Sequence, residues 1–286
     1  MHIRNPIEWL FGQADVAAAN IGDAQPEEYW AQRKLLRAPS VRKISIDDLR
    51  QSLHLGLKDF AAARTDVAFL CLIYPVIGVF LAVLTARGGL IPLMFPVASG
   101  FTLVGPFAAL GLYEISRRRE MTGSANWLAA FDVVRSPAIG SICLLGAMLI
   151  GLFLLWLLVA RGIYDVTLGP LPPASAAAFV SALFTTPAGW AMIVLGLAVG
   201  AVFAVAVLAI SVVSFPMLLD RPVNLRTAIR HSVYAVLRNP GPLGLWGIII
   251  AAGLFLGSLP CFLGLIVVLP VLGHSTWHLY RRLVRA

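Results

Sequence analysis

Two histidines in the last apolar segment of the chain stand at a spacing that could support chemistry. His274 and His278 lie four residues apart in Gly273-His-Ser-Thr-Trp-His278, so a helix would place both side chains on one face. Two imidazoles on one helix face can ligate a metal ion or a haem. The zinc-protease motif H-E-x-x-H is not met, because Ser275 stands where that motif has its glutamate.

Two carboxylates stand at comparable points of other apolar segments. Glu114 follows Pro106 by eight residues, as His278 follows Pro270, and Asp220 ends a further apolar segment. Ionisable residues at membrane depth are rare and commonly functional. We therefore consider one polar site, at the level of the inner leaflet, made from Glu114, Asp220, His274 and His278. The alternative interpretation is that these side chains form interfacial salt bridges and hydrogen bonds at helix ends.

The rest of the sequence offers no catalytic constellation. It contains no P-loop, no G-x-G-x-x-G and no G-x-S-x-G elbow. Cys71, Cys143 and Cys261 lie in or beside apolar runs without a C-x-x-C spacing, which favours buried, unreactive thiols. We therefore expect a protein that is not an enzyme and that has no bound cofactor or metal.

The composition points to lipid as the solvent of this chain. Of its 286 residues, 59% are hydrophobic and 13% are charged, and the mean hydropathy is +0.85. A water-soluble domain carries roughly a quarter charged residues. The net charge of +8 could suggest nucleic acid, but no nucleic-acid-binding module is recognisable, so nucleic acid is not an expected partner.

The elements that must position the polar residues are membrane-spanning helices, each of which needs about 20 apolar residues. Six segments qualify and are predicted to form three hairpins of an all-α, polytopic membrane protein. They cover about residues 67–85, 91–115, 138–160, 189–219, 243–259 and 262–280. Residues 161–188 form the longest connection between spans. A polar leader, residues 1–44, precedes the membrane domain of residues 45–286 and lacks the apolar core of a signal peptide.

Each hairpin is preceded by a predicted amphipathic helix at the membrane surface, at about residues 45–65, 124–135 and 224–238. In the first, Ser45-Ile-Asp-Asp48 resembles a capping box with Ser45 as the N-cap. Its apolar face is formed by Ile46, Leu49, Leu53, Leu57 and Phe60. The polar residues Asp47, Arg50, Gln51, Lys58 and Asp59 avoid that face.

An aromatic residue followed four positions later by arginine closes each amphipathic helix. The pairs are Phe60 and Arg64, Phe131 and Arg135, and Tyr234 and Arg238. Aromatic and arginine side chains suit a membrane interface, so the motif predicts three copies of one internal repeat. The alternative is convergence among short helices beside a membrane. Small-residue patterns at Gly196-x-x-x-Gly200 and Gly253-x-x-x-Gly257 favour packing within the chain over a dimer interface.

The basic residues predict the orientation of the protein. With these spans, 20 of the 22 lysines and arginines fall on one side of the membrane, and Arg87 and Arg161 fall on the other. Positive charge collects in cytoplasmic segments, so both termini are predicted to be cytoplasmic. The anionic headgroups of the bilayer are the expected partners of these cations. A membrane-protein partner or a homo-oligomer is left open.

Three stretches carry a family resemblance: Tyr74-Pro75, Gly105-Pro-Phe-Ala-Ala-Leu-Gly-Leu-Tyr-Glu-Ile-Ser-Arg-Arg-Arg119 and Pro270-Val-Leu-Gly-His-Ser-Thr-Trp-His-Leu-Tyr-Arg-Arg282. With them the chain, over about residues 41–283, resembles the proteobacterial integral-membrane family catalogued as domain-of-unknown-function family 2189. The resemblance implies a multi-span protein of the bacterial inner membrane and supplies no activity.

The sequence therefore favours a non-enzymatic accessory, scaffold or assembly partner of a membrane complex. A transporter or lipid-handling protein is the alternative, which would need a polar site among the spans. A metal- or haem-binding membrane protein that uses His274 and His278 is the third hypothesis.

Overall fold

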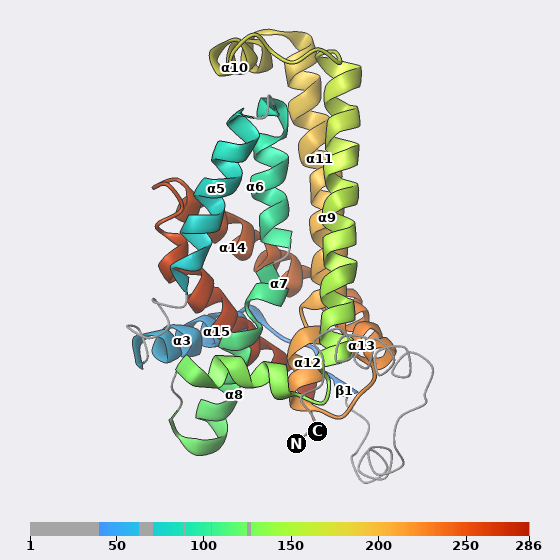
Figure 1. The fold of residues 1–286 in the computed structure, drawn as a ribbon. Helices are drawn as coiled ribbons and strands as arrows, with labels where there is room; N and C mark the ends of the chain where they lie inside the picture. Colours follow the sequence, from blue (N-terminus) through green and yellow to red (C-terminus); the bar gives the residue numbers. More distant parts are fainter. Residues whose placement is uncertain (1–39, 63–70, 88–89, 104, 125–126, 286) are drawn as a thin grey trace, which may run out of the picture.

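The computed structural model describes residues 40–62, 71–87, 90–103, 105–124 and 127–285 (Figure 1). Helices make up most of the described residues, and the strands among them are two of two residues each, so the all-α prediction is confirmed. The strands β1 (Ser40–Val41) and β2 (Val284–Arg285) pair antiparallel and hold the two ends of the described chain together.

The described helices include two 3-10 helices, η1 and η2. In chain order they are α3 (Ile46–Ala62), α5 (Ile73–Arg87), η1 (Ile91–Leu93), α6 (Met94–Leu103), α7 (Gly105–Ala108), α8 (Leu110–Thr122), η2 (Trp127–Arg135), α9 (Ile139–Thr167), α10 (Ala176–Thr185), α11 (Pro187–Ser211), α12 (Ser214–Asp220), α13 (Leu225–Arg238), α14 (Pro240–Ser258) and α15 (Leu265–Leu283). Figure 1 shows α9 and α11 running side by side along the molecule, with α5 and α6 next to them. Helices α3, α8, α12 and α13 gather at one end, and α10 lies at the other.

Three of these helices are long and apolar enough to cross a membrane, counted over the residues that the structure describes. They are Ile139–Thr167 (α9), Pro187–Asp220 (α11 taken together with α12) and Pro240–Ser258 (α14). Shorter apolar helices cover Ile73–Arg87, Ile91–Gly100 and Ala176–Thr185. Six spans arranged as hairpins therefore remain a prediction, and residues 67–70 of the first predicted span lie outside the described residues.

The second predicted span, residues 91–115, begins with the 3-10 helix η1 and continues through α6, α7 and the first part of α8. Residue 104, between α6 and α7, lies outside the described residues, and Ala109 forms a turn between α7 and α8. Prolines suit such irregular positions, because each lacks the N–H that an α-helix interior needs. Pro92 is the second residue of η1, and Pro106 is the second residue of α7. Helix α8 then continues past residue 115 to Thr122, where Gly123 ends it with a φ of 80°.

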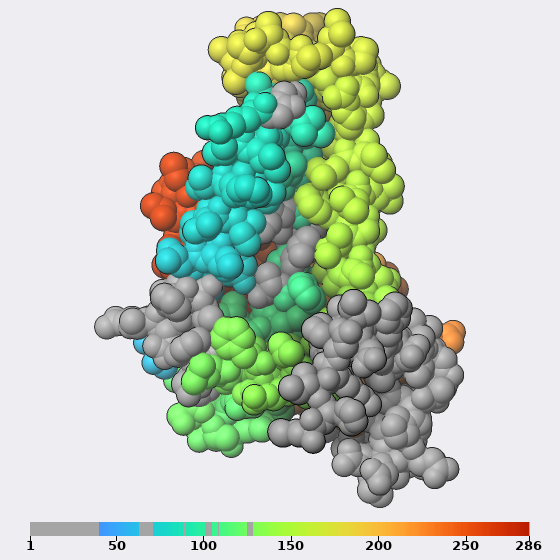
Figure 2. All heavy atoms as spheres, in the orientation of Figure 1, coloured from blue at the N-terminus to red at the C-terminus, as the bar shows by residue number. Residues whose placement is uncertain are grey.

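The fourth predicted span, residues 189–219, is divided between α11 and α12 at residues 212 and 213. Pro216, in the first turn of α12, has no backbone N–H to donate. The backbone N–H of Val213, at the break, donates to Oγ of the buried Ser232 on α13, at 3.1 Å. The long connection of residues 161–188 contains α10, which begins at the N-cap Ser175. Figure 2 shows the side chains of α10 covering the end of the molecule above α5 and α6.

The amphipathic helices pack on the protein through only part of their apolar faces. The capping box of α3 is confirmed, because Asp48 Oδ2 accepts from Ser45 N at 2.9 Å and Ser45 Oγ accepts from Asp48 N at 3.3 Å. The buried side of α3 is formed by Leu49, Ser52, Gly56 and Asp59, whereas Ile46 is 65% exposed and Leu57 is 52% exposed. Helices η2 and α13 also leave large apolar side chains exposed: Leu128, Phe131, Val134, Tyr234 and Leu237.

The described ends of the bundle differ in charge. Arg87 ends α5 beside η1, which contacts α10, and the NH2 of Arg161 donates to the carbonyl oxygen of Pro170 in the connection to α10. The other described lysines and arginines lie on α3, α8, η2, α13, the last turn of α15 and the segments beside them. The polar residues of interest lie at this basic end.

Both small-residue patterns can be tested against the packing. A Cβ atom at Gly253 or Gly257 would contact Val268 of α15 at 3.2 Å, so this pattern packs α14 on α15 within the chain as expected. A Cβ atom at Gly200 would lie 3.3 Å from Trp156 of α9, whereas one at Gly196 would meet nothing within 4 Å. Of this pattern, Gly200 therefore packs against another helix of the chain, whereas Gly196 does not.

Asn239, between α13 and α14, fastens the start of the described chain to the bundle. Its Oδ1 accepts from the backbone N–H of Ile44 at 2.8 Å, and its Nδ2 donates to the carbonyl oxygens of Arg42 and Ala235, both at 3.1 Å. The side chain is buried and therefore depends on these bonds. Pro240 follows as the first residue of α14, where its missing N–H has no cost.

Replacement of Asn239 by alanine is expected to lower the free energy of unfolding by about 1–3 kcal/mol, because the buried N–H of Ile44 loses its acceptor. Limited trypsin digestion at Arg42 and Lys43 in mild detergent checks this, and cleavage should become faster. The exposed Gln51 of α3 provides the control, and Gln51→Ala, which also removes an amide side chain, should be cleaved at the wild-type rate. Cleavage of Asn239→Ala at the wild-type rate would contradict the prediction.

Candidate functional site

Helices α3, α8 and α15 meet at the basic end of the molecule, where small residues let their backbones approach closely (Figure 1). A Cβ atom at Gly56 of α3 would lie 2.6 Å from the backbone nitrogen of Ser275 on α15. A Cβ atom at Gly273 of α15 would lie 2.6 Å from Cδ1 of Leu112 on α8. Polar side chains on the neighbouring turns of the three helices therefore come within hydrogen-bond distance of one another.

The carboxylate of Asp59, on α3, connects all three helices. Its Oδ2 accepts hydrogen bonds from Nε2 of His278 at 2.8 Å and from Oγ of Ser116 at 2.7 Å. Its Oδ1 pairs with NH1 of Arg119 at 2.9 Å. Nδ1 of His274 lies 2.8 Å from Oγ of Ser116. We call these five residues the Asp59 cluster; its histidines come from α15, and Ser116 and Arg119 come from α8.

The Asp59 cluster is largely closed to solvent. His274 and Ser116 are 0% and 1% exposed, and the Asp59 side chain is 10% exposed. A buried carboxylate with three partners stabilises a joint between helices, whereas removal of any one partner leaves a buried polar group unpaired. The cluster is thus a cross-link among α3, α8 and α15, and it is also the densest group of titratable side chains found among the described residues near the two histidines.

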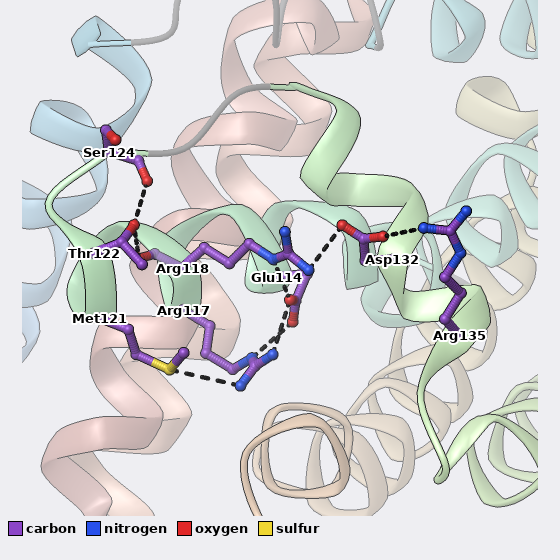
Figure 3. Close-up of polar contacts among 8 residues, drawn as sticks. All are labelled: Glu114, Arg117, Arg118, Met121, Thr122, Ser124, Asp132 and Arg135. Carbon is purple, nitrogen blue, oxygen red and sulfur yellow. Dashed lines mark hydrogen bonds and ion pairs between the residues drawn. The ribbon is translucent and has the colours of Figure 1, made fainter.

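Glu114 belongs to a separate network, which Figure 3 shows in close-up. Arg117 donates to both oxygens of the Glu114 carboxylate, at 2.7 and 2.9 Å. Arg118 donates to Oε1 of Glu114 at 2.9 Å and also pairs with Asp132 of η2 at 2.8 Å. Asp132 in turn pairs with Arg135 at 3.2 Å. This network ties α8 to η2 and satisfies the charge of Glu114, whose side chain is 4% exposed.

Asp220 belongs to a third network, at the end of α12. Its Oδ2 accepts from the hydroxyl of Tyr280 at 2.7 Å and lies 3.3 Å from NH1 of Arg281. Arg281 also pairs with Glu120 at 2.9 Å, and Glu120 accepts from Nε1 of Trp277 at 3.0 Å. This network joins α12, α15 and the last part of α8.

The structure therefore does not bring the four predicted site residues together, which corrects the single-site interpretation. His274 and His278 share one cluster, but Glu114 and Asp220 each pair with other residues. The interpretation based on salt bridges and helix-end hydrogen bonds describes Glu114 and Asp220 correctly. Asp59 and Ser116 were missed, because Asp59 sits on the polar side of an amphipathic helix that was expected to face water. The recurrence of small and polar residues at Ser52, Gly56 and Asp59 was the available signal.

The aromatic and arginine motif differs between its copies. In α13, NH1 of Arg238 donates to the hydroxyl of Tyr234 at 2.8 Å, and the guanidinium lies 5.8 Å from the ring centroid. In η2, Arg135 pairs with Asp132, three residues earlier, because three residues make one turn of a 3-10 helix. Phe60 is partly buried on α3, and Arg64 lies outside the described residues. The internal repeat remains a prediction.

The two histidine rings point their nitrogens at a carboxylate and a hydroxyl. Across the described ranges, no group of three or more His, Cys, Asp and Glu residues is arranged to hold a metal ion. Of the cysteines, Cys71 is buried, but Cys143 and Cys261 are exposed on the isolated chain, which corrects the expectation that all three thiols are buried.

Two carboxyls at this end have lowered pKa values, which predicts loss of stability in acid. Burial alone would raise the pKa of Asp59, but hydrogen bonds from His278 and Ser116 outweigh it, and the pKa is lowered. Burial would likewise raise the pKa of Asp48, but hydrogen bonds from the backbone N–H of Ser45 and from Arg282 outweigh it, and this pKa is also lowered. Both carboxyls bind protons less readily in the folded state, so their stabilisation is complete above an unfolded-state pKa of about 4 and is lost as the pH falls through the lower folded-state values.

We therefore expect the resistance to unfolding in mild detergent to decline as the pH falls from about 4 to about 2. Asp59→Asn should decline less steeply over this interval, because its side chain cannot be protonated. The exposed Asp47 on the same helix provides the matched control, and Asp47→Asn should follow the wild-type curve. Equal slopes for Asp59→Asn and the wild type would contradict the assignment.

Comparisons with known proteins identify a family for part of the chain. Residues 94–220, from α6 to the end of α12, match the model of the family described as predicted integral membrane protein (DUF2189). This match confirms the resemblance over residues 94–220, which contain the motif that ends in Arg119; Tyr74-Pro75 and the stretch from Pro270 to Arg282 lie outside the match. Comparison with curated proteins and with solved structures gave no match. The family match and the long apolar helices together identify an integral membrane protein.

Proposed function

We propose that this integral membrane protein is a non-enzymatic accessory, scaffold or assembly partner of a membrane complex. The observation that carries the proposal is the large apolar surface that the chain does not cover. In the most apolar part of Pro187–Asp220, 6% of the residues are buried in the protein, and the corresponding values for Ile139–Thr167 and Pro240–Ser258 are 28% and 22%. Such surfaces require lipid or another apolar partner.

The polar residues support the same proposal. Glu114 and Asp220 are used to join helices, and so is Asp59, with partners at 2.7 to 2.9 Å. A catalytic acid, base or nucleophile needs a free reacting atom that a substrate can reach. Because Glu114 and His274 are 3% and 0% exposed, substrate access to them would require the helices to separate.

We also propose six spans in the bacterial inner membrane, with both termini cytoplasmic. The exposed apolar residues of α3, η2 and α13, such as Ile46, Phe131 and Leu237, suit the acyl boundary of the inner leaflet, and the arginines beside them suit anionic headgroups. In a cysteine-free background, Lys58→Cys should be labelled from the cytoplasmic side and Ser175→Cys from the periplasmic side. Labelling of both positions from the same side would contradict this topology.

Site-specific photocrosslinking tests the scaffold role. A photoreactive residue is placed at Val194, Leu197 or Val205, apolar positions of α11 that are each more than half exposed. The protein is expressed at its native level, irradiated in intact membranes and purified in a gentle detergent. We expect a discrete crosslinked protein, in a fixed ratio to this chain, from at least one of these positions. The control position is the fully buried Leu145 of α9, which should give no intermolecular product.

The outcomes separate the functions under consideration. A crosslinked product of defined composition that co-purifies without irradiation supports the accessory role and identifies the partner class. A chain that purifies as a lone monomer and crosslinks only to lipid at every position contradicts it. That result would favour the transporter or lipid-handling alternative.

A further inference from the structure

One nitrogen in the Asp59 cluster has no partner. Nε2 of His274 has no hydrogen-bond partner among the described residues, although the side chain is 0% exposed. Buried polar atoms in folded proteins are almost always paired, so an unpaired one requires an explanation. The geometry of the rest of the cluster determines what this nitrogen can do.

The hydrogen bonds fix the tautomer of His274. The ionised Asp59 carboxylate can only accept, so the single hydroxyl proton of Ser116 is donated to Asp59 Oδ2, at 2.7 Å. Ser116 must then accept in its 2.8 Å contact with Nδ1 of His274, which therefore carries a proton. A neutral imidazole has one protonated nitrogen, so Nε2 of His274 has a free lone pair. Such a nitrogen is a base with no partner.

The charged and titratable groups around this ring come from three packed helices. They are Asp59 on α3, Arg119 on α8, His278 on α15 itself, and Tyr113 of α8, which lies beside Thr276 of α15 and Tyr74 of α5. Asp59 would attract a positive charge on His274, and Arg119 would repel it. The oxygens of Asp59 already accept from Ser116, His278 and Arg119. None of these contacts supplies an acceptor to Nε2 of His274.

We propose that Nε2 of His274 is a buried proton-binding site, and that proton uptake there loosens the contact of α15 with α3 and α8. In the step, an O–H bond of a hydronium ion breaks, its proton adds to the lone pair of Nε2, water is left, and the imidazole becomes an imidazolium. The product is a buried positive charge, which the backbone carbonyl of Leu112 and Asp59 favour and which burial, His278 and Arg119 oppose. This inference does not depend on the accessory role proposed above.

The sign of the pH effect follows from the folded environment. A histidine in the unfolded chain binds a proton near pH 6.5. The folded protein opposes that proton, so stability is complete above about pH 6.5 and is lost as the pH falls below it. This interval lies above the acid interval in which Asp48 and Asp59 titrate, so the two effects are separable.

The experiment compares unfolding of the full chain in lipid nanodiscs between about pH 7.5 and 5. His274→Asn is the informative variant, because its Nδ2 can still donate to Ser116 while no titratable base remains. His278→Gln is the matched control, because its Nε2 can still donate to Asp59 and His274 is intact. The quantity measured is the number of protons taken up on unfolding, obtained from the pH dependence of the unfolding equilibrium.

On unfolding, the wild type and His278→Gln should each bind more protons than His274→Asn does, by a difference of at most about one proton. Equal uptake in all three proteins would overturn the proposal, as would a change only in His278→Gln. If His274→Asn does not fold, nitrogen NMR of the histidine-labelled wild type decides. The signal of His274 is assigned by elimination with variants of the other four histidines. Nε2 should lack a proton at pH 7.5 and gain one on acidification, whereas a protonated Nε2 at pH 7.5 would overturn the proposal.

Discussion

Replacement of Gly56 by leucine is expected to abolish the stable packing of α3 on α15. A Cβ atom at this position would lie 2.6 Å from the backbone nitrogen of Ser275 and 2.9 Å from its Cα, so the obstacle is backbone and cannot rotate away. Overpacking of a core typically costs about 1–3 kcal/mol, and here the two helices themselves must separate, so we expect a cost of about 3 kcal/mol or more. The Asp59 cluster, one turn further along α3, would be pulled apart with them.

The measurement for Gly56→Leu is the midpoint of unfolding in a detergent titration, followed by tryptophan fluorescence. Gly151→Ala is the matched control, because Gly151 is also inside a helix and a Cβ atom there meets nothing within 4 Å. Removing the side-chain oxygen with Ser275→Ala should not rescue Gly56→Leu, since the backbone contact remains. Wild-type stability of Gly56→Leu, or full rescue by Ser275→Ala, would show that the helix contact is not as close as described.

Replacement of Asp59 by alanine is expected to cause the second large loss of stability. It removes the acceptor of His278 and Ser116 and leaves the guanidinium of Arg119 without its carboxylate partner. Breaking a buried ion pair by removing one partner costs about 3–5 kcal/mol, and the 32% exposure of the Arg119 side chain places the expected loss near the lower limit. Because Asp59 connects α3 to α8 and α15, its removal should loosen the packing of α3, and α3 should become more accessible to protease.

Two variants make the Asp59 prediction specific. Asp47→Ala removes an exposed carboxylate from the same helix and is expected to change the free energy of unfolding by less than about 0.5 kcal/mol. Asp59→Asn keeps the shape and one acceptor oxygen and should lose less stability than Asp59→Ala. Unfolding in detergent at pH 7 measures all three. Equal stability of Asp59→Ala and Asp47→Ala would mean that the cluster contributes nothing to the joint.

Local features of this chain could be predicted from the sequence because they depend on neighbouring residues. The capping box at Ser45 and Asp48 is such a feature, and so are the first-turn position of Pro240 and the break near Pro216. Each follows from the hydrogen-bonding capacity of a residue within a few positions.

The grouping of the polar residues could not be predicted, because it depends on which faces of distant helices meet. Asp59 and His278 are 219 positions apart, and nothing local relates them. Hydrophobic periodicity assigned the apolar side of α3 correctly, but it could not show that Leu49 of that side is buried together with Asp59 while Ile46 and Leu57 are exposed. Gly56 against Ser275, rather than the apolar side, sets how α3 is rotated.

His274 and His278 illustrate the division between sequence and structure. By itself, the sequence determined that both rings share one face of a helix near the basic end of an integral membrane protein, because four residues complete about one helical turn. Only the tertiary structure decided that Asp59 and Ser116 are their partners, that Glu114 and Asp220 are not, and that one nitrogen of His274 is left without a partner. The physical reason is that hydrogen bonds between helices require close contact of backbones, and this contact is set by small residues far apart in the chain.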